Sequence, residues 1–322
     1  MAFLRRIYSF DYMGHKKWWF TISAIIIIAG LISLFAKGGG NPAKGLNYGL
    51  EFKEGTRISI AFEKQPSLAE VRGTVTDAGY ADAQIQETPN VSGSNQPGFQ
   101  IQTVVLSTTE QDQLKQALND AYTIAGSNGT EIFSLETVGA TFGRQVVSSS
   151  LKAVAIALLL ILIYVTFRFQ WKFAIGAIVA EVHDLLIVVG IYSLTGREVT
   201  TATIAAVLTI LGYSLYDTVI VFDRIRENQP KLGRMPYGDM VNVSIWETLT
   251  RSINTTMIVL LPVLCLLLFG GATLKDFAFA LLVGILSGAF SSIFVASPIL
   301  TLLKEREPQY RKLKLAARTD GP

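Results

Sequence analysis

The sequence predicts a polytopic α-helical membrane protein with six transmembrane helices and one α+β domain placed after the first of them. Half of the 322 residues are hydrophobic (50%), only 16% are charged, and the mean hydropathy is +0.40, which is high for a soluble protein. Six apolar segments approach or exceed the roughly 20 residues that a membrane-spanning helix needs. A polar stretch of domain size, residues 37–147, separates the first apolar segment from the second.

The first apolar segment, residues 18–36, follows a basic stretch at residues 1–17 that contains Arg5, Arg6, Lys16 and Lys17. The apolar core of a signal peptide is about 7–15 residues long, so this segment is longer than expected for one. No convincing small-x-small cleavage site follows it. We therefore expect residues 18–36 to be retained as transmembrane helix 1.

The polar stretch alternates strand and helix patterns in the order βαββαβ, which is typical of a ferredoxin-like α+β domain. Ser67 and Glu70 have the spacing of a capping box at the start of the first helix. The expected strands are 56–63, 82–87, 99–106 and 131–138, and the expected helices are 67–78 and 108–125.

Residues 148–303 are expected to hold transmembrane helices 2–6. Their apolar segments are 151–167, 173–194, 200–222, 255–270 and 277–303. The loops at 168–172 and 223–251 and the tail at 304–322 are rich in Lys and Arg, whereas the loops around Arg197 and Lys275 carry one basic residue each. The positive-inside rule then places both termini, residues 1–17 and 304–322, in the cytosol and the 37–147 domain on the extracytoplasmic side.

Several classes of enzyme lack support in the sequence. There is no Gly-Lys-Ser/Thr phosphate-binding loop, no His-Glu-x-x-His motif and no Gly-x-Ser-x-Gly motif, which argues against an ATPase or a hydrolase. The one cysteine, Cys265, excludes a disulfide framework and a cysteine metal cluster. We expect a protein that is not an enzyme and has no cofactor.

Asp217 is the main functional candidate because it lies within the apolar segment 200–222. An ionised side chain at the centre of a membrane helix costs about 2.5–3.5 kcal/mol on insertion scales, so such residues usually have a function. The charged run that begins at Asp223 fixes this helix end at a water interface, roughly two turns from Asp217. The alternative is a neutral acid that only hydrogen-bonds a neighbouring helix.

A second polar group lies in the segment 173–194, which contains Glu181, His183 and Asp184. Adjacent side chains point in different directions on a helix, and the chain has only one other histidine, so a metal site is disfavoured. We expect His183 and Asp184 to serve helix packing or a proton route.

Two further features of these segments concern packing. Gly284 and Gly288 form a small-residue stripe for close helix contact, with a helix of this chain or of a partner. Pro262 is expected to kink the fifth segment.

The run Gly212-Tyr-Ser-Leu-Tyr-Asp-Thr218, continued by Val-Ile-Val-Phe-Asp-Arg-Ile-Arg-Glu-Asn228, resembles the fourth transmembrane helix of the SecF family, within the RND transporter superfamily. Tyr216 stands where that family usually has Asn before the acid. Residues 47–56 and 138–143 resemble two further SecF segments, although Lys53 and Glu54 replace an expected glycine.

The resemblance also implies site residues. SecF proteins carry an arginine at the position of Arg251 that is implicated in proton transport together with the acid at the position of Asp217. A buried carboxylic acid retains its proton, and an approaching guanidinium favours proton release, so movement of the arginine would load and unload the acid. Further candidates for the proton route or for packing are His183, Asp184, Ser214 and Thr218.

By resemblance, the chain would work with SecD and the SecYEG channel in the inner membrane of a bacterium. Proton flow would promote the late steps of export of unfolded polypeptides. Two alternatives remain open at this point: an RND-type half-transporter for lipids or small molecules, and a scaffold subunit that transports nothing. The sequence also leaves open whether sodium replaces protons.

Overall fold

The computed structural model describes residues 10–88, 90–91, 94, 96–127, 130–232 and 235–319. The described chain divides into two compact units, which are treated separately below. The helical unit comprises Met1–Asn47 and Leu151–Pro322, and the α/β unit comprises Tyr48–Ser150. Arg5 and Arg6 and the last three residues of the predicted basic tail lie outside the described residues.

Six helices in the described residues are long and apolar enough to cross a membrane. They are α2 (Lys16–Lys37), α5 (Ala140–Arg168), α6 (Trp171–Thr195), α7 (Thr201–Leu232), α8 (Tyr237–Phe269) and α9 (Ala272–Ser291), the last of which continues through the π-helical η3 (Ser292–Ala296) into α10 (Ser297–Lys304). A short helix, α11 (Pro308–Thr319), follows, and the small elements η1 (Pro42–Lys44) and β8 (Glu198–Val199) lie in connections.

Three of these helices extend well beyond the apolar segments that predict them, including α5, which begins at Ala140 and not near residue 151. α7 runs to Leu232 and α8 begins at Tyr237, so most of the region 223–251, expected as a loop, is helical. Hydropathy marks only the part of a helix that lies in the bilayer, whereas ion pairs along and between helices stabilise the rest. Arg224 on α7 pairs with Glu227 at 2.7 Å and with Glu247 of α8 at 2.6 Å.

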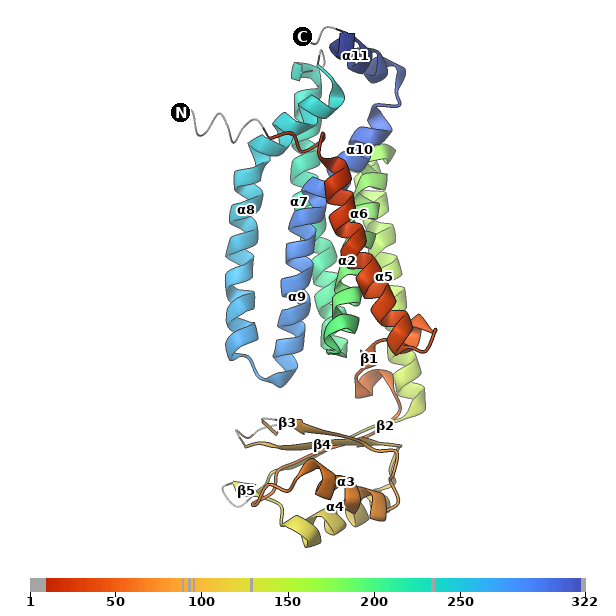
Figure 1. Cartoon of the computed structure of the whole chain (residues 1–322), viewed down its shortest axis with the longest axis vertical. Helices are drawn as coiled ribbons and strands as arrows, with labels where there is room; N and C mark the ends of the chain where they lie inside the picture. The colour runs from red at the N-terminus through yellow and green to blue at the C-terminus, as the bar shows by residue number, and fades with distance from the viewer. Residues whose placement is uncertain are drawn as a thin grey trace. The chain divides into compact units, whose positions relative to one another are not determined.

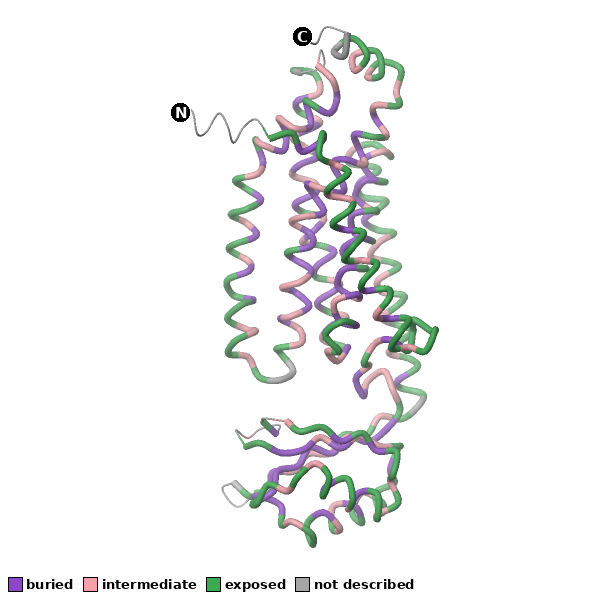
Figure 2. Tube along the Cα trace, in the orientation of Figure 1, coloured by how far each residue is buried: buried purple, intermediate pink, exposed green. Residues whose placement is uncertain are grey.

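The helices α6, α7 and α9 form the middle of the helical unit, with α2 packed on α6 and α8 packed on α7 and α9 (Figure 1). The central helices are also the more buried ones (Figure 2). In the most apolar 18-residue stretch of each helix, 56% of the residues are buried in α6, but only 17% in α2 and 6% in α5. Many of the buried polar side chains therefore lie on α6, α7 and α9.

Glycines allow the central helices to approach closely. A Cβ atom at Gly288 would lie 2.9 Å from the Cβ of Ser214, and one at Gly284 would collide with the side chain of Ile210. The small-residue stripe on α9 thus contacts α7 of the same chain. Likewise a Cβ atom at Gly30 of α2 would lie 2.5 Å from the Cα of Gly190 on α6, so these two helices meet at their backbones.

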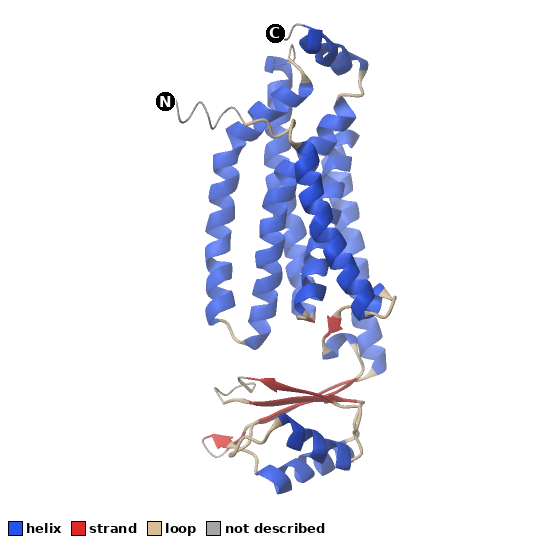
Figure 3. Ribbon diagram, viewed as in Figure 1, coloured by secondary structure: helices blue, strands red, loops and turns tan. Residues whose placement is uncertain are grey.

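The α/β unit consists of a four-stranded sheet with two helices on one face (Figure 3). Its strands pair in the order β3-β4-β2-β7, and every neighbouring pair is antiparallel. The principal elements are β2 (Gly55–Ile60), α3 (Leu68–Asp77), β3 (Gln84–Thr88), β4 (Gly98–Thr103), α4 (Thr108–Tyr122) and β7 (Phe133–Val138), with the minor elements β1 (Asn47–Tyr48), η2 (Leu50–Phe52), β5 (Gly126–Ser127) and β6 (Thr130–Glu131).

The core of the α/β unit lies between the sheet and its helices. Ile58, Ile60, Phe99 and Ile101 of the two central strands are fully buried and share one apolar cluster with residues of α3 and α4, including Leu118. Alternate residues of a strand point to the same face, which is why these four side chains gather on the helix side.

The predicted capping box at the start of α3 is confirmed. The backbone N–H of Ser67 donates to the Glu70 carboxylate at 2.8 Å, and the backbone N–H of Glu70 donates to the Ser67 hydroxyl at 3.3 Å. Hydrogen bonds from the backbone and then the side chain of Ser67 lower the pKa of Glu70. α4 begins with a second capping box, formed by Ser107 and Glu110.

Candidate functional site

Asp217 lies near the middle of α7 and is 1% exposed. Among the described residues, no donor makes a hydrogen bond to either of its carboxylate oxygens. The side chains of Thr255 and Thr256 on α8 are close to it; the Thr255 hydroxyl donates elsewhere, whereas the Thr256 hydroxyl accepts one hydrogen bond and, within the described part of the chain, keeps its own hydrogen free. Thr255 donates to backbone carbonyls of the preceding turn, and the Tyr213 hydroxyl donates to Thr256 at 3.4 Å. A charge buried without partners is costly, so the site suits a carboxyl group that carries a proton.

The side chain of Arg251 on α8, the expected partner of Asp217, contacts Tyr216 instead. Its Nη2 donates to the hydroxyl of Tyr216 at 3.2 Å, and it forms no ion pair with Asp217 in the described part of the chain. Arg251 still acts on the Asp217 carboxylate electrostatically. The structure thus brings the two predicted residues to the same contact between α7 and α8, with the arginine held by Tyr216.

Asp184 of α6 is the centre of a polar cluster in the helical unit. It is fully buried and accepts hydrogen bonds from Ser214 of α7 at 2.7 Å, and from Ser287 and Ser291 of α9 at 2.6 and 2.8 Å. Its neighbour His183 contributes a fourth contact, Nδ1 to Oδ1, at 3.0 Å. These contacts satisfy both oxygens and join the three central helices through one carboxylate.

The sequence-based expectation that His183 and Asp184 point apart is wrong. Their Cβ atoms do leave the helix in different directions, but the imidazole is long enough to fold back onto the neighbouring carboxylate. The ring also stacks on Phe290 of α9, with centroids 6.2 Å apart. In the described residues, no group of three or more His, Cys, Asp or Glu side chains has the arrangement of a metal site.

The two remaining candidates on α7 belong to this central contact. Ser214 donates to Asp184, as described above, and Thr218 hydrogen-bonds Ser292 at 2.8 Å. Asp217, three residues after Ser214 on the same helix, lies nearer to α8. α7 therefore presents one polar face to α6 and α9 and one buried acid to α8.

Sequence reasoning did not assign a role to Glu181, Ser287 or Ser291. Glu181 is fully buried one turn before Asp184, and neither of its carboxylate oxygens has a hydrogen-bond partner among the described residues. A signal was present, because Glu181 and Asp184 are three residues apart and Ser287 and Ser291 are four apart, so each pair shares a helix face.

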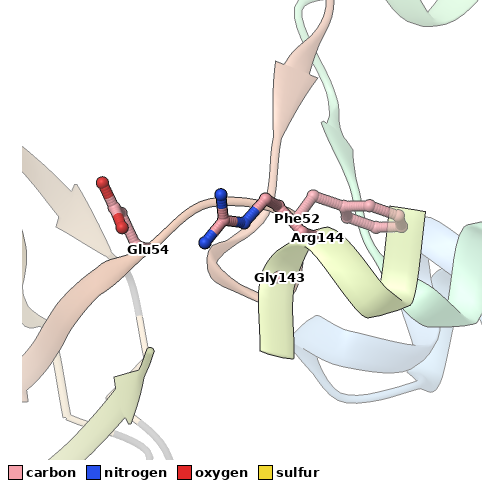
Figure 4. A pocket seen from close by; sticks show the side chains of 4 residues that line it. All are labelled: Phe52, Glu54, Gly143 and Arg144. Atoms are coloured by element: carbon pink, nitrogen blue, oxygen red, sulfur yellow. The ribbon is translucent and has the colours of Figure 1, made fainter. Parts of the chain in front are cut away.

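In the α/β unit, two segments singled out in the sequence lie side by side. An open pocket of about 230 Å³ is lined by Phe52 and Glu54 from the first segment and by Gly143 and Arg144 from the second. Figure 4 shows the Arg144 side chain extending toward Glu54 while the Phe52 ring points the other way. A Cβ atom at Gly143 would lie 3.5 Å from the main chain of Phe52, which is an ordinary packing contact.

A family model and individual relatives match this chain over most of its length. Residues 118–306 match the family described as "Protein export membrane protein SecD/SecF, C-terminal". The protein translocase subunit SecF of Streptomyces coelicolor is 37% identical over 97% of this chain and 82% of its own length. The SecF subunit of Thermodesulfovibrio yellowstonii is 39% identical over 92% of this chain and 95% of its own length.

A solved structure is similar as well. The crystal structure of SecDF, a translocon-associated membrane protein from Thermus thermophilus, superimposes with a TM-score of 0.79 at 36% identity. The match covers 92% of this chain and 39% of that longer chain.

Proposed function

This chain belongs to the SecD/SecF family of protein export membrane proteins, and we propose that it serves as the SecF subunit of a protein-export machinery. The resemblance of its fourth transmembrane helix to SecF is confirmed by relatives that match nearly the whole chain. Those relatives are named as protein translocase subunits, which supports a role for this chain as a component of transport. Its six apolar helices make it a multi-pass membrane protein.

The partner of this subunit is a SecD protein. This proposal is supported by the Thermus thermophilus SecDF chain, of which the present chain spans only 39%. A separate SecD chain would supply the rest, and the pair would act on unfolded polypeptides that leave the SecYEG channel.

The energy source is the proton gradient, and Asp217 is the group that binds the proton. The observation that carries this proposal is a carboxyl group that is 1% exposed, has no hydrogen-bond partner in the described part of the chain and lies in mid-helix. Arg251 resets the acid when it leaves Tyr216 and approaches Asp217, because a nearby guanidinium favours the ionised carboxylate. Each proton that crosses 100 mV releases about 2.3 kcal/mol for movement of the complex.

The α/β unit is a ferredoxin-like domain on the extracytoplasmic side, where its movement helps to draw exported chains outward. The element order βαββαβ and the antiparallel strand order β3-β4-β2-β7 support the ferredoxin-like assignment. The excess of Lys and Arg in the loops on the opposite side supports the orientation, with both termini in the cytosol.

Cysteine labelling tests the orientation in intact cells. In a Cys265→Ala background, Ser94→Cys should react with a membrane-impermeant thiol reagent, and Gln309→Cys should react only after the cells are broken. The reverse pattern would contradict the proposed sidedness.

Copurification and transport test the function itself. The tagged chain, solubilised in mild detergent, should bring a SecD protein with it. Inner-membrane vesicles depleted of the chain should lose the stimulation of late translocation by a proton gradient and regain it when the chain is restored. A depleted membrane that keeps its full response to the gradient would refute the proposed function.

A further inference from the structure

Glu181 is a buried acid that the proposed proton route through Asp217 does not use. It lies on α6, is fully buried, and has two carboxylate oxygens without a hydrogen-bond donor among the described residues. His183, two residues on, is 7% exposed, and its Nε2 atom also lacks a partner there. The cluster therefore has unused polar atoms in the interior of the helical unit, although Asp184 beside them is satisfied.

The two carboxyl groups of this cluster differ in their partners. Three serine hydroxyls and His183 surround Asp184, and donors of this kind stabilise the charged carboxylate. Glu181 accepts none of these hydrogen bonds among the described residues, because the Ser214 hydroxyl near it donates to Asp184 instead, and it lies one turn from Asp184 on the same helix. Two ionised carboxylates so close in a dry interior repel each other, so a pair of this kind retains a proton on the less stabilised member.

The elements packed against α6 supply no cation to balance Glu181. In α2 the residues 18–36 carry no charge, and neither do residues 277–303 of α9, η3 and α10. Asp217 is the only charged residue in the 201–222 part of α7, and it faces α8. Lys304 at the end of α10 donates to Gln170 at 2.8 Å and pairs with Glu307.

We infer that Glu181 is a second proton-binding site of the helical unit, occupied in the state described here and exchanged during transport. Its ligand is a proton and not a metal ion, because no group of three or more His, Cys, Asp or Glu among the described residues has a metal-binding arrangement. Occupancy follows from the geometry alone, whereas exchange rests on the proposed function.

The helix α7 connects the two sites. Ser214 hydrogen-bonds Asp184 at 2.7 Å, and Asp217, three residues further along, is the proton site that faces α8. Loss of the proton from Glu181 would place a second negative charge beside Asp184 and weaken the contact of α6 with α7. A change in this contact at Ser214 moves Asp217, three residues further along α7, relative to Arg251, so the two sites exchange protons in a coupled way.

Infrared spectroscopy tests the occupancy. In the purified full-length chain with Asp217→Asn, a carboxylic acid C=O band that shifts in D₂O should persist at neutral pH. Glu181→Gln added to that background should remove the band, whereas Glu136→Gln, a change at an exposed strand position of the α/β unit, should leave it. A band that survives in the Glu181→Gln variant would overturn the inference.

Export measurements test the exchange. At equal abundance of the complex, Glu181→Gln should lose the stimulation of translocation by a proton gradient, and Glu181→Asp, which keeps a titratable group, should regain part of it. Wild-type stimulation in Glu181→Gln, together with its loss in Asp217→Asn, would overturn the exchange and leave the proposed function intact. Absence of gradient stimulation in the wild-type complex would instead refute the proposed function and the exchange with it.

Discussion

Gly288→Ala should destabilise the helical unit, because the contact of α9 with α7 leaves no room for a methyl group. The added Cβ would lie 2.9 Å from the Cβ of Ser214 and 3.2 Å from its Cα, so the helix backbones must separate. Overpacking of this kind costs about 1–3 kcal/mol. The movement also lengthens the hydrogen bond from Ser214 to Asp184, which is 2.7 Å in the structure.

Gly212→Ala is the matched control, because a Cβ atom at Gly212 meets nothing within 4 Å. Both changes remove a helical glycine and gain the same helix propensity, up to about 1 kcal/mol. The difference between their free energies of unfolding therefore isolates the contact and should be about 1–3 kcal/mol. The assay is reversible unfolding of the full chain in mixed micelles with increasing denaturing detergent. If Gly288→Ala were as stable as Gly212→Ala, the close packing of α9 on α7 would be refuted.

Two further changes test the hydrogen bond from Arg251 to Tyr216 and the capping box of Ser67 and Glu70 in the α/β unit. Tyr216→Phe removes the hydroxyl that holds Arg251, so the freed guanidinium should pair with Asp217 and keep it ionised. Gradient-stimulated export should then fall several-fold. Stimulation of wild-type size would argue that the hydrogen bond of Arg251 to Tyr216 has no such role. In the α/β unit, hydrogen bonds from Ser67 hold the pKa of Glu70 below its ordinary value of 4.5. These hydrogen bonds therefore stabilise the fold above pH 4.5, and the stabilisation is lost as the pH falls through the lowered pKa. Glu70→Gln should therefore melt at a lower temperature at neutral pH and lose less stability on acidification, and an unchanged acid-induced loss would contradict this.

The predictions that succeeded from sequence rest on local patterns. Six apolar segments mark six helices, and the spacing of Ser67 and Glu70 identifies a helix start, because both signals are contained within one element. Asp217 stands out for the same reason, as a charge within an apolar run. The ends of α7 and α8 were placed poorly because these helices continue past their apolar parts, where the pairing of Arg224 with Glu247 stabilises them.

The cluster around Asp184 could not be derived in this way. Its donors Ser214, Ser287 and Ser291 lie 30, 103 and 107 residues away in the chain, and serine is common in helices that pack closely. Only the packing of three helices brings these hydroxyls to one carboxylate. The same packing leaves both oxygens of Glu181 without a hydrogen bond among the described residues, so the sequence shows the two acids but not which of them is satisfied.

The central claim is that Asp217 binds and releases a proton in each cycle of export, and Asp217→Asn tests it most directly. Asparagine keeps the shape of the side chain and removes its titration, so assembly with the partner subunit should be unchanged. The measurement is late-stage translocation into inner-membrane vesicles with and without a proton gradient, at equal abundance of the complex. The account predicts that the variant loses the gradient-dependent part of translocation and keeps the rest. Stimulation of wild-type size in Asp217→Asn would contradict it and remove Asp217 from the mechanism.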